Sequence, residues 1–296
     1  MKINKFMGVS ALILSLITHS VLAQSTQSVK AQSEQHVQFQ LIRNATVKIT
    51  YADTTFLIDP MFAKKGFYPG FENTFRHELR NPLVELPISV SDIIDDVDAV
   101  IVTHTHLDHW DAAAQAALQK DIPLFTQNEA DAKLIQSQGF TNVQVLGDHT
   151  EFQGIVLHKT DGQHGTDAMY SLPELASFLG EAMGIVFQAK DYKTVYLVGD
   201  TIWRPEVEQS IVKYSPDVII LNAGNALIDG FDESIIMGED DALRTHQVAP
   251  NAKIVAVHMD AVNHMALSRR ALADFAEEKD IQDVILIPAD GEGYKF

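Results

Sequence analysis

A chain of 296 residues is long enough for one large α/β domain or for two small ones. Its composition, 46% hydrophobic and 21% charged without any repetitive tract, excludes a disordered chain and a solenoid. The formal net charge of -18 argues against nucleic acid as a substrate, because an acidic surface repels phosphate backbones. A requirement for solubility explains the acidity equally well.

Residues 1–23 have the features of a cleaved signal peptide. Lys2 and Lys5 precede an apolar run at 11–18, and small residues at 21–23 offer a cleavage site. A membrane-spanning helix needs about 20 apolar residues, and Ser15 already interrupts this run, which disfavours a permanent anchor. We therefore expect a periplasmic or secreted protein with no stable membrane anchor after cleavage.

The remainder of the chain reads as a short lead-in followed by one domain. Residues 24–36 are polar, are rich in Ser and Gln, and are expected to form a flexible lead-in to a domain at 37–296. The sequence contains no cysteine, which excludes disulfides and a lipid-modified cysteine. Any metal site must therefore use nitrogen and oxygen ligands.

The apolar pattern predicts alternating strands and helices along this domain. Strands are expected at 37–42, 46–51, 55–58, 99–102, 142–146, 154–158, 184–188, 194–198, 218–221 and 254–257, with a terminal strand at 284–287. Helices are expected at 111–120, 128–138, 171–181 and 268–278. No linker divides these elements. Two β-rich halves, each followed by helices, fit an α/β fold of four layers with helices outside two facing sheets.

Four side chains with metal-binding chemistry follow the buried strand at 99–102. They are His104, His106, Asp108 and His109. A strand end is where an α/β sheet presents side chains to a ligand crevice. Neutral imidazoles and a carboxylate suit Zn²⁺, and also Mn²⁺ or Fe²⁺. A single histidine here would indicate little, but three histidines and one aspartate within six positions favour a metal site over chance clustering.

This segment resembles the metallo-β-lactamase superfamily, because it matches the signature His-x-His-x-Asp-His without substitution. The resemblance extends to the segments at 58–60, 163–165 and 198–201 and to a late histidine at a strand end. Within the superfamily the sequence is most similar to the ascorbate-6-phosphate-lactonase-like branch. The resemblance implies a four-layer αββα sandwich that holds two divalent cations.

The resemblance also implies which residues would hold each cation. One cation would bind His104, His106 and His164; the other would bind Asp108, His109 and His258; and Asp200 would bridge them. The sequence itself supports Asp200, because a carboxylate that follows a buried strand and the flexible Gly199 can reach two cations, whereas an isolated Gly-Asp-Thr is usually a turn or a helix cap.

Two of these assignments have competitors in the sequence. His164 lies beside Gly162 and Gly165, which allow close approach of the backbone to a metal, whereas its competitor His158 lies within a predicted strand. His258 directly follows an apolar strand and is favoured over His264. His264 then becomes a candidate for orienting the substrate or relaying a proton.

Residues around the ligands are less clearly defined by the sequence. Asp59 is expected either to accept a hydrogen bond from a ligating imidazole or simply to form a turn before Pro60. Five side chains are candidates for lining a pocket, although ordinary packing or a surface position explains each of them better: Tyr68, Phe71, Arg80, Trp110 and Glu292.

Together these features predict a hydrolase with two divalent metal ions, zinc first and manganese or iron as alternatives. Metal binding lowers the pKa of water from about 15.7 to about 7, so a hydroxide that bridges the cations would be the nucleophile. Asp108 and Asp200 would be the catalytic carboxylates, with Asp200 positioning the attacking water. His264 would be a third catalytic candidate.

The expected substrate is a small molecule with an ester-like bond, a lactone being preferred. A phosphodiester is the main alternative. A β-lactam is less favoured, because the metal-binding cysteine of one large β-lactamase class is absent. A non-catalytic metal-binding protein of the same fold is disfavoured as well, because all seven candidate ligands are present.

Overall fold

The computed structural model describes Met1 and residues 36–296. The signal peptide expected at residues 1–23 and nearly all of the lead-in expected at 24–36 therefore lie outside the described residues. None of the helices in the described part of the chain is long and apolar enough to cross a membrane.

The first sheet contains seven strands. In spatial order these are β14 (Gly293–Lys295), β1 (Gln38–Arg43), β2 (Thr46–Tyr51), β3 (Thr54–Ile58), β4 (Ala99–Val102), β5 (Leu124–Thr126) and β6 (Val143–Val145). Strands β14 and β1 to β3 pair antiparallel, and β3 to β6 pair parallel. The carboxyl ends of β3 and β4 therefore lie at the same edge of this sheet.

The second sheet also contains seven strands. Their spatial order is β13 (Ile285–Leu286), β12 (Lys253–Val257), β11 (Val218–Asn222), β10 (Val195–Leu197), β9 (Met183–Gln188), β8 (Ile155–Asp161) and β7 (Thr150–Phe152). Strands β7 to β10 pair antiparallel, and β10 to β13 pair parallel. The carboxyl ends of β10, β11 and β12 therefore share one edge.

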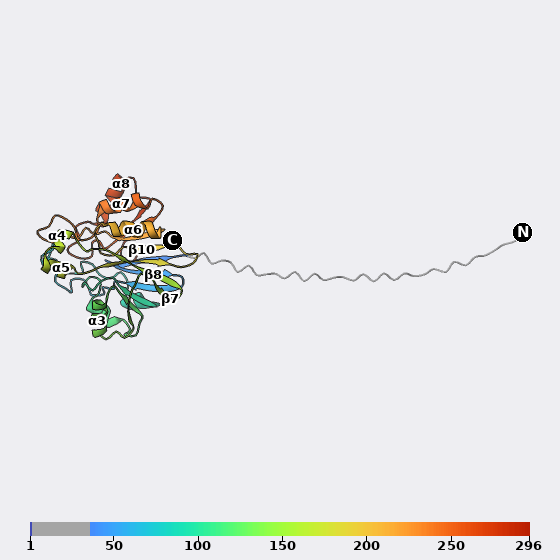
Figure 1. The fold of residues 1–296 in the computed structure, drawn as a ribbon, viewed down its shortest axis with the longest axis horizontal. Coiled ribbons are helices and arrows are strands. Elements are labelled where there is room, and N and C mark those ends of the chain that lie inside the picture. Colours follow the sequence, from blue (N-terminus) through green and yellow to red (C-terminus); the bar gives the residue numbers. More distant parts are fainter. Residues whose placement is uncertain (2–35) are drawn as a thin grey trace. The chain divides into compact units, whose positions relative to one another are not determined.

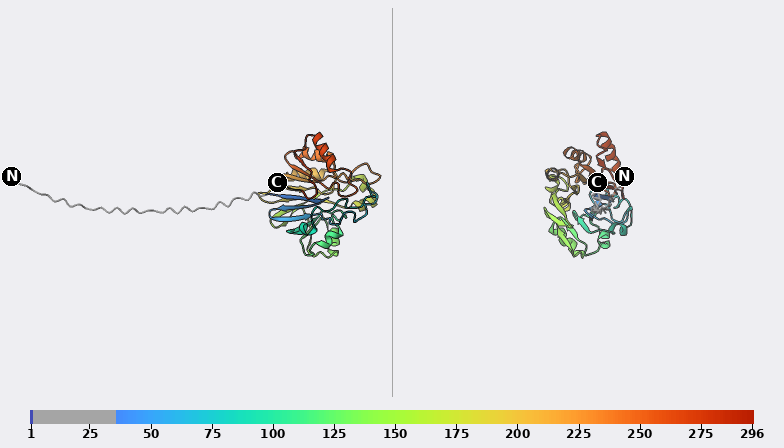
Figure 2. Two further views of the ribbon diagram at one scale, coloured as in Figure 1. Left: turned by 180° about the vertical axis from the view of Figure 1, so that it is seen from behind. Right: turned by 90° about the vertical axis from the view of Figure 1, so that its right-hand side faces the viewer.

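The two sheets face each other across an apolar core, and helices cover their outer faces. The helices are α1 (Val90–Ile94), α2 (Ala112–Ala117), α3 (Glu129–Ser137), α4 (Asp167–Tyr170), α5 (Pro173–Leu179), α6 (Pro205–Tyr214), α7 (Glu239–Val248) and α8 (Arg269–Glu278). Figure 1 shows α6, α7 and α8 on one side of the strands and α3 on the other, and Figure 2 shows the same layers from behind. The predicted four-layer αββα sandwich is confirmed.

Strand β4 shows how the sequence builds these layers. All four of its residues are buried, and the segment does not alternate between apolar and polar residues. Ala99 and Ile101 join the core between the sheets, whereas Val100 and Val102 pack with α1, α2 and α3. Because successive side chains of a strand point to opposite faces, a strand covered on both faces needs apolar residues throughout.

Three helices begin directly after a polar residue whose side chain caps the first turn. Asp111, Asn128 and Ser268 accept hydrogen bonds from backbone N–H groups in the first turns of α2, α3 and α8. These bonds satisfy donors that the helix itself leaves without partners. The predicted helices at 111–120, 128–138 and 268–278 are thus confirmed with slightly shorter bounds.

The sequence prediction was wrong about the end of the chain and missed several elements. The segment at 284–287 is not the terminal strand, because β14 follows it and returns to the first sheet, where it pairs with β1. Helices α6 and α7 were missed, as were the short elements α1, α4, β5 and β7. The strands of two or three residues are too short to show a period of their own.

Several residues that follow strands have left-handed backbone conformations, among them three in the predicted site segments. Asp59 follows β3 with φ 50°, Gly199 follows β10 with φ 77°, and His258 follows β12 with φ 64°. Such φ values are uncommon for residues other than glycine. At Gly199 a Cβ atom would lie 2.2 Å from the carbonyl oxygen of Met183, so only glycine fits. These sharp turns direct the side chains of Asp59, Asp200 and His258 across the edges of the sheets.

Candidate metal centre

The segment after β4 carries four of the predicted metal ligands. His104, Asp108 and His109 are buried, and His106 is half-buried. The backbone turns tightly here, because the N–H group of His109 donates to the carbonyl oxygen of His106 at 3.0 Å. Four potential ligands are thereby presented by one short segment at the edge of the first sheet.

The second sheet contributes the other three candidates. His164 follows β8, Asp200 follows β10 and His258 follows β12. The donor atoms form three groups, in each of which all atoms lie within 4.8 Å of one another. The groups are His104, His106 and His164; His104, His109 and Asp200; and Asp108, His109 and His258. All seven predicted ligands therefore meet, and the first and last groups match the two sets that the resemblance implies.

Asp200 lies at the centre of these groups. Its Oδ2 atom is 3.1 Å from Nε2 of His109 and 3.4 Å from Nε2 of His164. Its distances to Nε2 of His258 and His104 are 3.5 and 3.9 Å. The Nδ2 atom of Asn222, the last residue of β11, donates to the other oxygen at 2.6 Å. A carboxylate oxygen placed among four imidazoles has the position that a bridging ligand needs.

The competing histidines lie elsewhere. The Nδ1 atom of His158 lies 2.6 Å from the carbonyl oxygen of Asp148, and its ring packs against Tyr214. His264 belongs to none of the three groups but lines the adjacent cavity. His258, rather than His264, thus lies with Asp108 and His109.

Hydrogen bonds fix which nitrogen faces the centre in four of the five imidazoles, all except His258. Nδ1 of His109 donates to Asp59 at 2.9 Å, and Asp59 also accepts the N–H and hydroxyl groups of Thr103, both at 2.7 Å. Because the Thr103 hydroxyl donates to Asp59, it accepts from Nδ1 of His104 at 3.1 Å. Nε2 of both histidines therefore faces the centre and can bind a cation through its lone pair once the ring is neutral.

Two backbone carbonyl groups orient the rings of His106 and His164, the remaining ligands of the first group. Nδ1 of His164 donates to the carbonyl oxygen of Ile235, and Nε2 of His106 donates to that of Phe178, both at 2.9 Å. The inner nitrogens of His104 and His106 are then 3.0 Å apart with their lone pairs facing each other. Such an arrangement is unfavourable unless a cation lies between the atoms. The nitrogen and oxygen donors present therefore fit divalent cations.

Burial and charge shift the pKa values of these groups strongly before a cation binds. Burial lowers the pKa of His164 to about 4 and that of His104 well below its usual value. Burial also opposes a charge on His109, but the carboxylates of Asp200, Asp59 and Asp108 raise its pKa well above the ordinary value. A bound cation would replace the proton that His109 otherwise holds.

The two carboxylates of the centre are ionised. Burial acts to raise the pKa of Asp200, yet the imidazoles of His109 and His258 hold it well below its usual range. The pKa of Asp108 is lowered by the same two histidines, again against the effect of burial. Both side chains are therefore available as anionic ligands near neutral pH.

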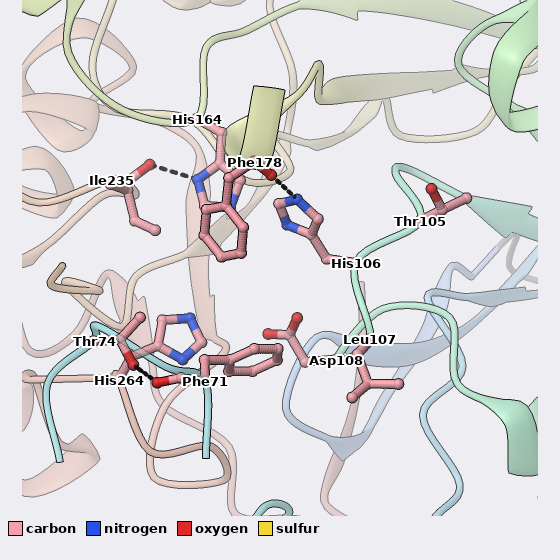
Figure 3. Close-up of a pocket in the computed structure, with 10 residues that line it drawn as sticks. All are labelled: Phe71, Thr74, Thr105, His106, Leu107, Asp108, His164, Phe178, Ile235 and His264. Carbon is pink, nitrogen blue, oxygen red and sulfur yellow. Dashed lines mark hydrogen bonds between the residues drawn. The ribbon is translucent and has the colours of Figure 1, made fainter. Parts of the chain in front are cut away.

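A cavity of about 290 Å³ opens onto this cluster. Figure 3 shows His106, Asp108, His164 and His264 at its wall. Its remaining lining residues are Phe71, Thr74, Thr105, Leu107, Phe178 and Ile235. Among the described residues, no lysine or arginine lines the cavity. The cavity therefore suits a small uncharged molecule with an apolar group.

Of the five pocket candidates in the sequence, Phe71 alone belongs to this lining. Trp110 packs in the outer core and donates to Gln138, and Arg80 donates to the carbonyl oxygens of Gly66 and Phe67. The other two, Tyr68 and Glu292, are also absent from the lining.

Several residues of the site were not predicted from the sequence. Two of them act through backbone carbonyl groups, which any residue type supplies. The carbonyl oxygen of the half-exposed Phe178 accepts from His106, and that of Ile235 accepts from His164. Asn222 carries a detectable signal, because a polar side chain at the carboxyl end of an apolar strand faces the same crevice as the ligands.

Replacement of Asp59 by asparagine is expected to weaken metal binding about 10- to 100-fold, because asparagine cannot accept all three hydrogen bonds from His109 and Thr103. Competition with a chromophoric chelator measures this affinity. Asp98→Asn is the matched control, because Asp98 accepts one N–H group, from Thr55 at the opposite end of β3. Equal affinity in the wild type and the Asp59 variant would contradict the role given to Asp59.

An αββα sandwich with a His and Asp cluster at one sheet edge is the architecture of metallo-β-lactamase-type hydrolases. In agreement, residues 54–259 match the family described as Beta-lactamase superfamily domain. The UPF0173 protein YddR of Bacillus subtilis is 48% identical over 256 residues, which cover 86% of this chain and 98% of that protein. The chain belongs to the metallo-β-lactamase superfamily and, within it, to the UPF0173 metal-dependent hydrolase family.

Two solved structures are similar over nearly their whole length. A possible metal-dependent hydrolase from Veillonella parvula DSM 2008 is 51% identical with a TM-score of 0.86, and the match covers 87% of this chain and 98% of that one. An isothiocyanate hydrolase from Delia radicum gut bacteria is 48% identical with a TM-score of 0.85, covering 88% of this chain and 99% of that one.

Proposed function

We propose that this chain hydrolyses small uncharged electrophiles at a two-cation centre, with isothiocyanates as the first substrate class. The observation that carries the proposal is the cavity, which joins apolar walls directly to Asp108, His106 and His164 without a lysine or arginine among its lining residues. The similarity to an isothiocyanate hydrolase over 88% of this chain supports the same choice.

The reaction consumes one water. The water oxygen bonds to the central carbon of R–N=C=S, and a proton reaches the nitrogen. The resulting thiocarbamic acid loses carbonyl sulfide and leaves the amine R–NH₂. Divalent cations, when bound, make water nucleophilic near neutral pH and polarise the bond under attack. We propose that His104, His106 and His164 hold one cation, that Asp108, His109 and His258 hold the other, and that Asp200 contacts both.

The chain's own side chains would orient the reactants. Asp200, held by Asn222, accepts a hydrogen bond from the attacking water. His264 lies on the cavity wall, and its Nδ1 atom is buried without a hydrogen-bond partner among the described residues. Burial lowers the pKa of His264 to about 4, so the ring is neutral at pH 7 and offers one donor to the substrate's nitrogen or sulfur.

Lactone hydrolysis is the second candidate, because the same attack on an electrophilic carbon opens a lactone and the sequence resembles a lactonase branch. The lining offers no lysine or arginine to a phosphate group, which favours a lactone without one. Phosphodiesters rank third, because only the bound cations would pair with their negative charge. We also propose that the chain is exported, on the features of residues 1–23 alone.

A substrate panel with defined metal loading tests the proposal. We expect an aromatic isothiocyanate to be turned over, with kcat/KM on the order of 10⁴ M⁻¹ s⁻¹ or higher, and one amine to form for each molecule consumed. Lactone, phosphodiester and β-lactam probes are measured in parallel. Turnover of the lactone without the isothiocyanate would replace the first candidate by the second, and no turnover of any probe would overturn the proposal.

A further inference from the structure

The segment between β3 and α1 carries part of the cavity wall. Within it, residues 67–81, termed here the covering segment, contain no helix or extended strand but only isolated bridges. Phe71 and Thr74 of this segment line the cavity. Figure 3 shows both beside His264. Two backbone hydrogen bonds, from Phe75 to Leu227 and from Asp229 to Asn73, hold one side of this wall, and side-chain contacts hold the rest.

Most of those contacts converge on one residue. The Oδ1 atom of Asn263 accepts the N–H group of Phe71 at 3.0 Å and the Nδ2 group of Asn81 at 2.7 Å. Its Nδ2 atom donates to the hydroxyl of Thr74 and to the carbonyl oxygen of Phe75, both at 2.8 Å. An asparagine side chain has two donors and two acceptor sites, so each is used and all four are directed to the covering segment.

The backbone around Asn263 strengthens the same attachment. Its N–H group donates to Oδ1 of Asn81 at 2.8 Å, and its carbonyl oxygen accepts from Nε of Arg76 at 3.1 Å. Another guanidinium nitrogen of Arg76 donates to the carbonyl oxygen of Met265 at 2.6 Å. Asn263 is fully buried, so removing its side chain leaves four buried polar groups of the covering segment without their protein partner.

Asn263 also connects the wall to the catalytic segment. It lies between His258 and His264, and the ring of His264 meets the ring of Phe71 edge-on, with centroids 5.0 Å apart. Neither Asn263 nor Asn81 lines the cavity itself. The amide of Asn263 thus sets the distance between the aromatic wall and the candidate catalytic histidine without touching a bound substrate.

We infer that Asn263 is a positioning residue for substrate selection: by holding Phe71 and Thr74 against the segment that bears His264, it fixes the part of the cavity that receives the organic group of the substrate. This inference rests on the proposed function. It predicts that loosening the covering segment alters recognition of the organic group and leaves the chemistry at the cation centre nearly intact.

The kinetic test uses the metal-loaded enzyme and the variant Asn263→Ala. For an aromatic isothiocyanate we expect KM to rise about tenfold while kcat changes less than about threefold, because contacts with an apolar group are worth roughly 10- to 200-fold in specificity. A short alkyl isothiocyanate offers much less apolar surface to Phe71, so its KM and kcat should change far less. The preference for the aromatic substrate therefore falls about tenfold, with unchanged metal content.

Two further variants make the kinetic test decisive. Asn81→Ala removes two hydrogen bonds between Asn81 and Asn263, outside the cavity. It should therefore raise KM for the aromatic substrate as well. If Asn263→Ala does not fold, Asn81→Ala takes its place in the test. Tyr51→Phe is the control for lost buried hydrogen bonds, because the Tyr51 hydroxyl donates to the carbonyl oxygen of Lys193 at 2.8 Å and accepts the N–H group of Ala189 at 3.1 Å. It should leave the substrate preference unchanged.

Hydrogen exchange of residues 67–81 separates this inference from the proposed function, because it needs no substrate. We expect exchange in the covering segment to accelerate at least about tenfold in both asparagine variants and not in Tyr51→Phe. Wild-type enzyme inactive on isothiocyanates would overturn the proposed function but not this result. Unchanged exchange, or faster exchange with an unchanged substrate preference, would overturn the inference.

Discussion

Replacing Asp200 with asparagine is expected to lower kcat/KM by about 10³-fold, which corresponds to about 4 kcal/mol of lost transition-state stabilisation. The physical reason is its position: one carboxylate oxygen lies 3.1 to 3.9 Å from the inner nitrogens of four histidines. Asparagine keeps the shape but removes the negative charge that two cations would share. Steady-state kinetics of the metal-loaded proteins measures the loss.

Asp217→Asn is the matched control for this substitution. Asp217 precedes β11, is exposed, and accepts the N–H group of Thr194 at 2.8 Å. The same change of charge there should leave kcat/KM within about twofold, as expected for a surface site away from the cations. Activity of the Asp200 variant within tenfold of the wild type would exclude Asp200 as a bridging ligand.

Removal of the cations by a chelator is expected to abolish activity and to lower Tm by about 10 °C. A ligand present at about 1,000 times its Kd stabilises the folded state by about 4 kcal/mol, and each kcal/mol shifts Tm by about 2–4 °C for a domain of this size. The centre joins both sheets, so the cations stabilise the contact between them. Calorimetry before and after chelation measures the shift, and readdition of a divalent cation should restore both properties.

The Asp200→Asn protein provides the internal comparison for the chelation experiment. Having lost a shared ligand, it should show a smaller change in Tm on chelation than the wild type does. Chelated wild-type protein that retains both its Tm and its activity would show that the cluster does not hold functional cations, whatever its geometry.

The local part of the candidate centre was predictable from the sequence. His104, His106, Asp108 and His109 lie within six consecutive positions after an apolar strand, so their proximity follows from the chain itself. The resemblance then indicated His164, Asp200 and His258, and the structure brings their donor atoms into the same groups. The αββα layering was predictable for a similar reason, because strands such as β3, β4 and β11 are buried throughout and are mainly apolar.

Other parts were not predictable because their signals are weak or nonlocal. Strand β14 has three residues, of which only Tyr294 is apolar, and its pairing with β1 joins opposite ends of the domain. Asn263 is one polar residue in a loop, and nothing in the sequence indicates that its partners lie about 190 positions earlier. Helix α6 does begin with a signal, Pro205 in its first turn, which the periodicity analysis did not use.

The return of β14 to the first sheet has a consequence for synthesis of the protein on the ribosome. Strand β14 hydrogen-bonds to β1, and the two backbone bonds between Val37 and Phe296 extend this pairing. Because β14 is translated after every strand of the second sheet, the nascent chain exposes the outer backbone groups of β1 until β14 has emerged. Exposed strand edges pair readily with other chains, so the arrival of β14 protects β1 from aggregation.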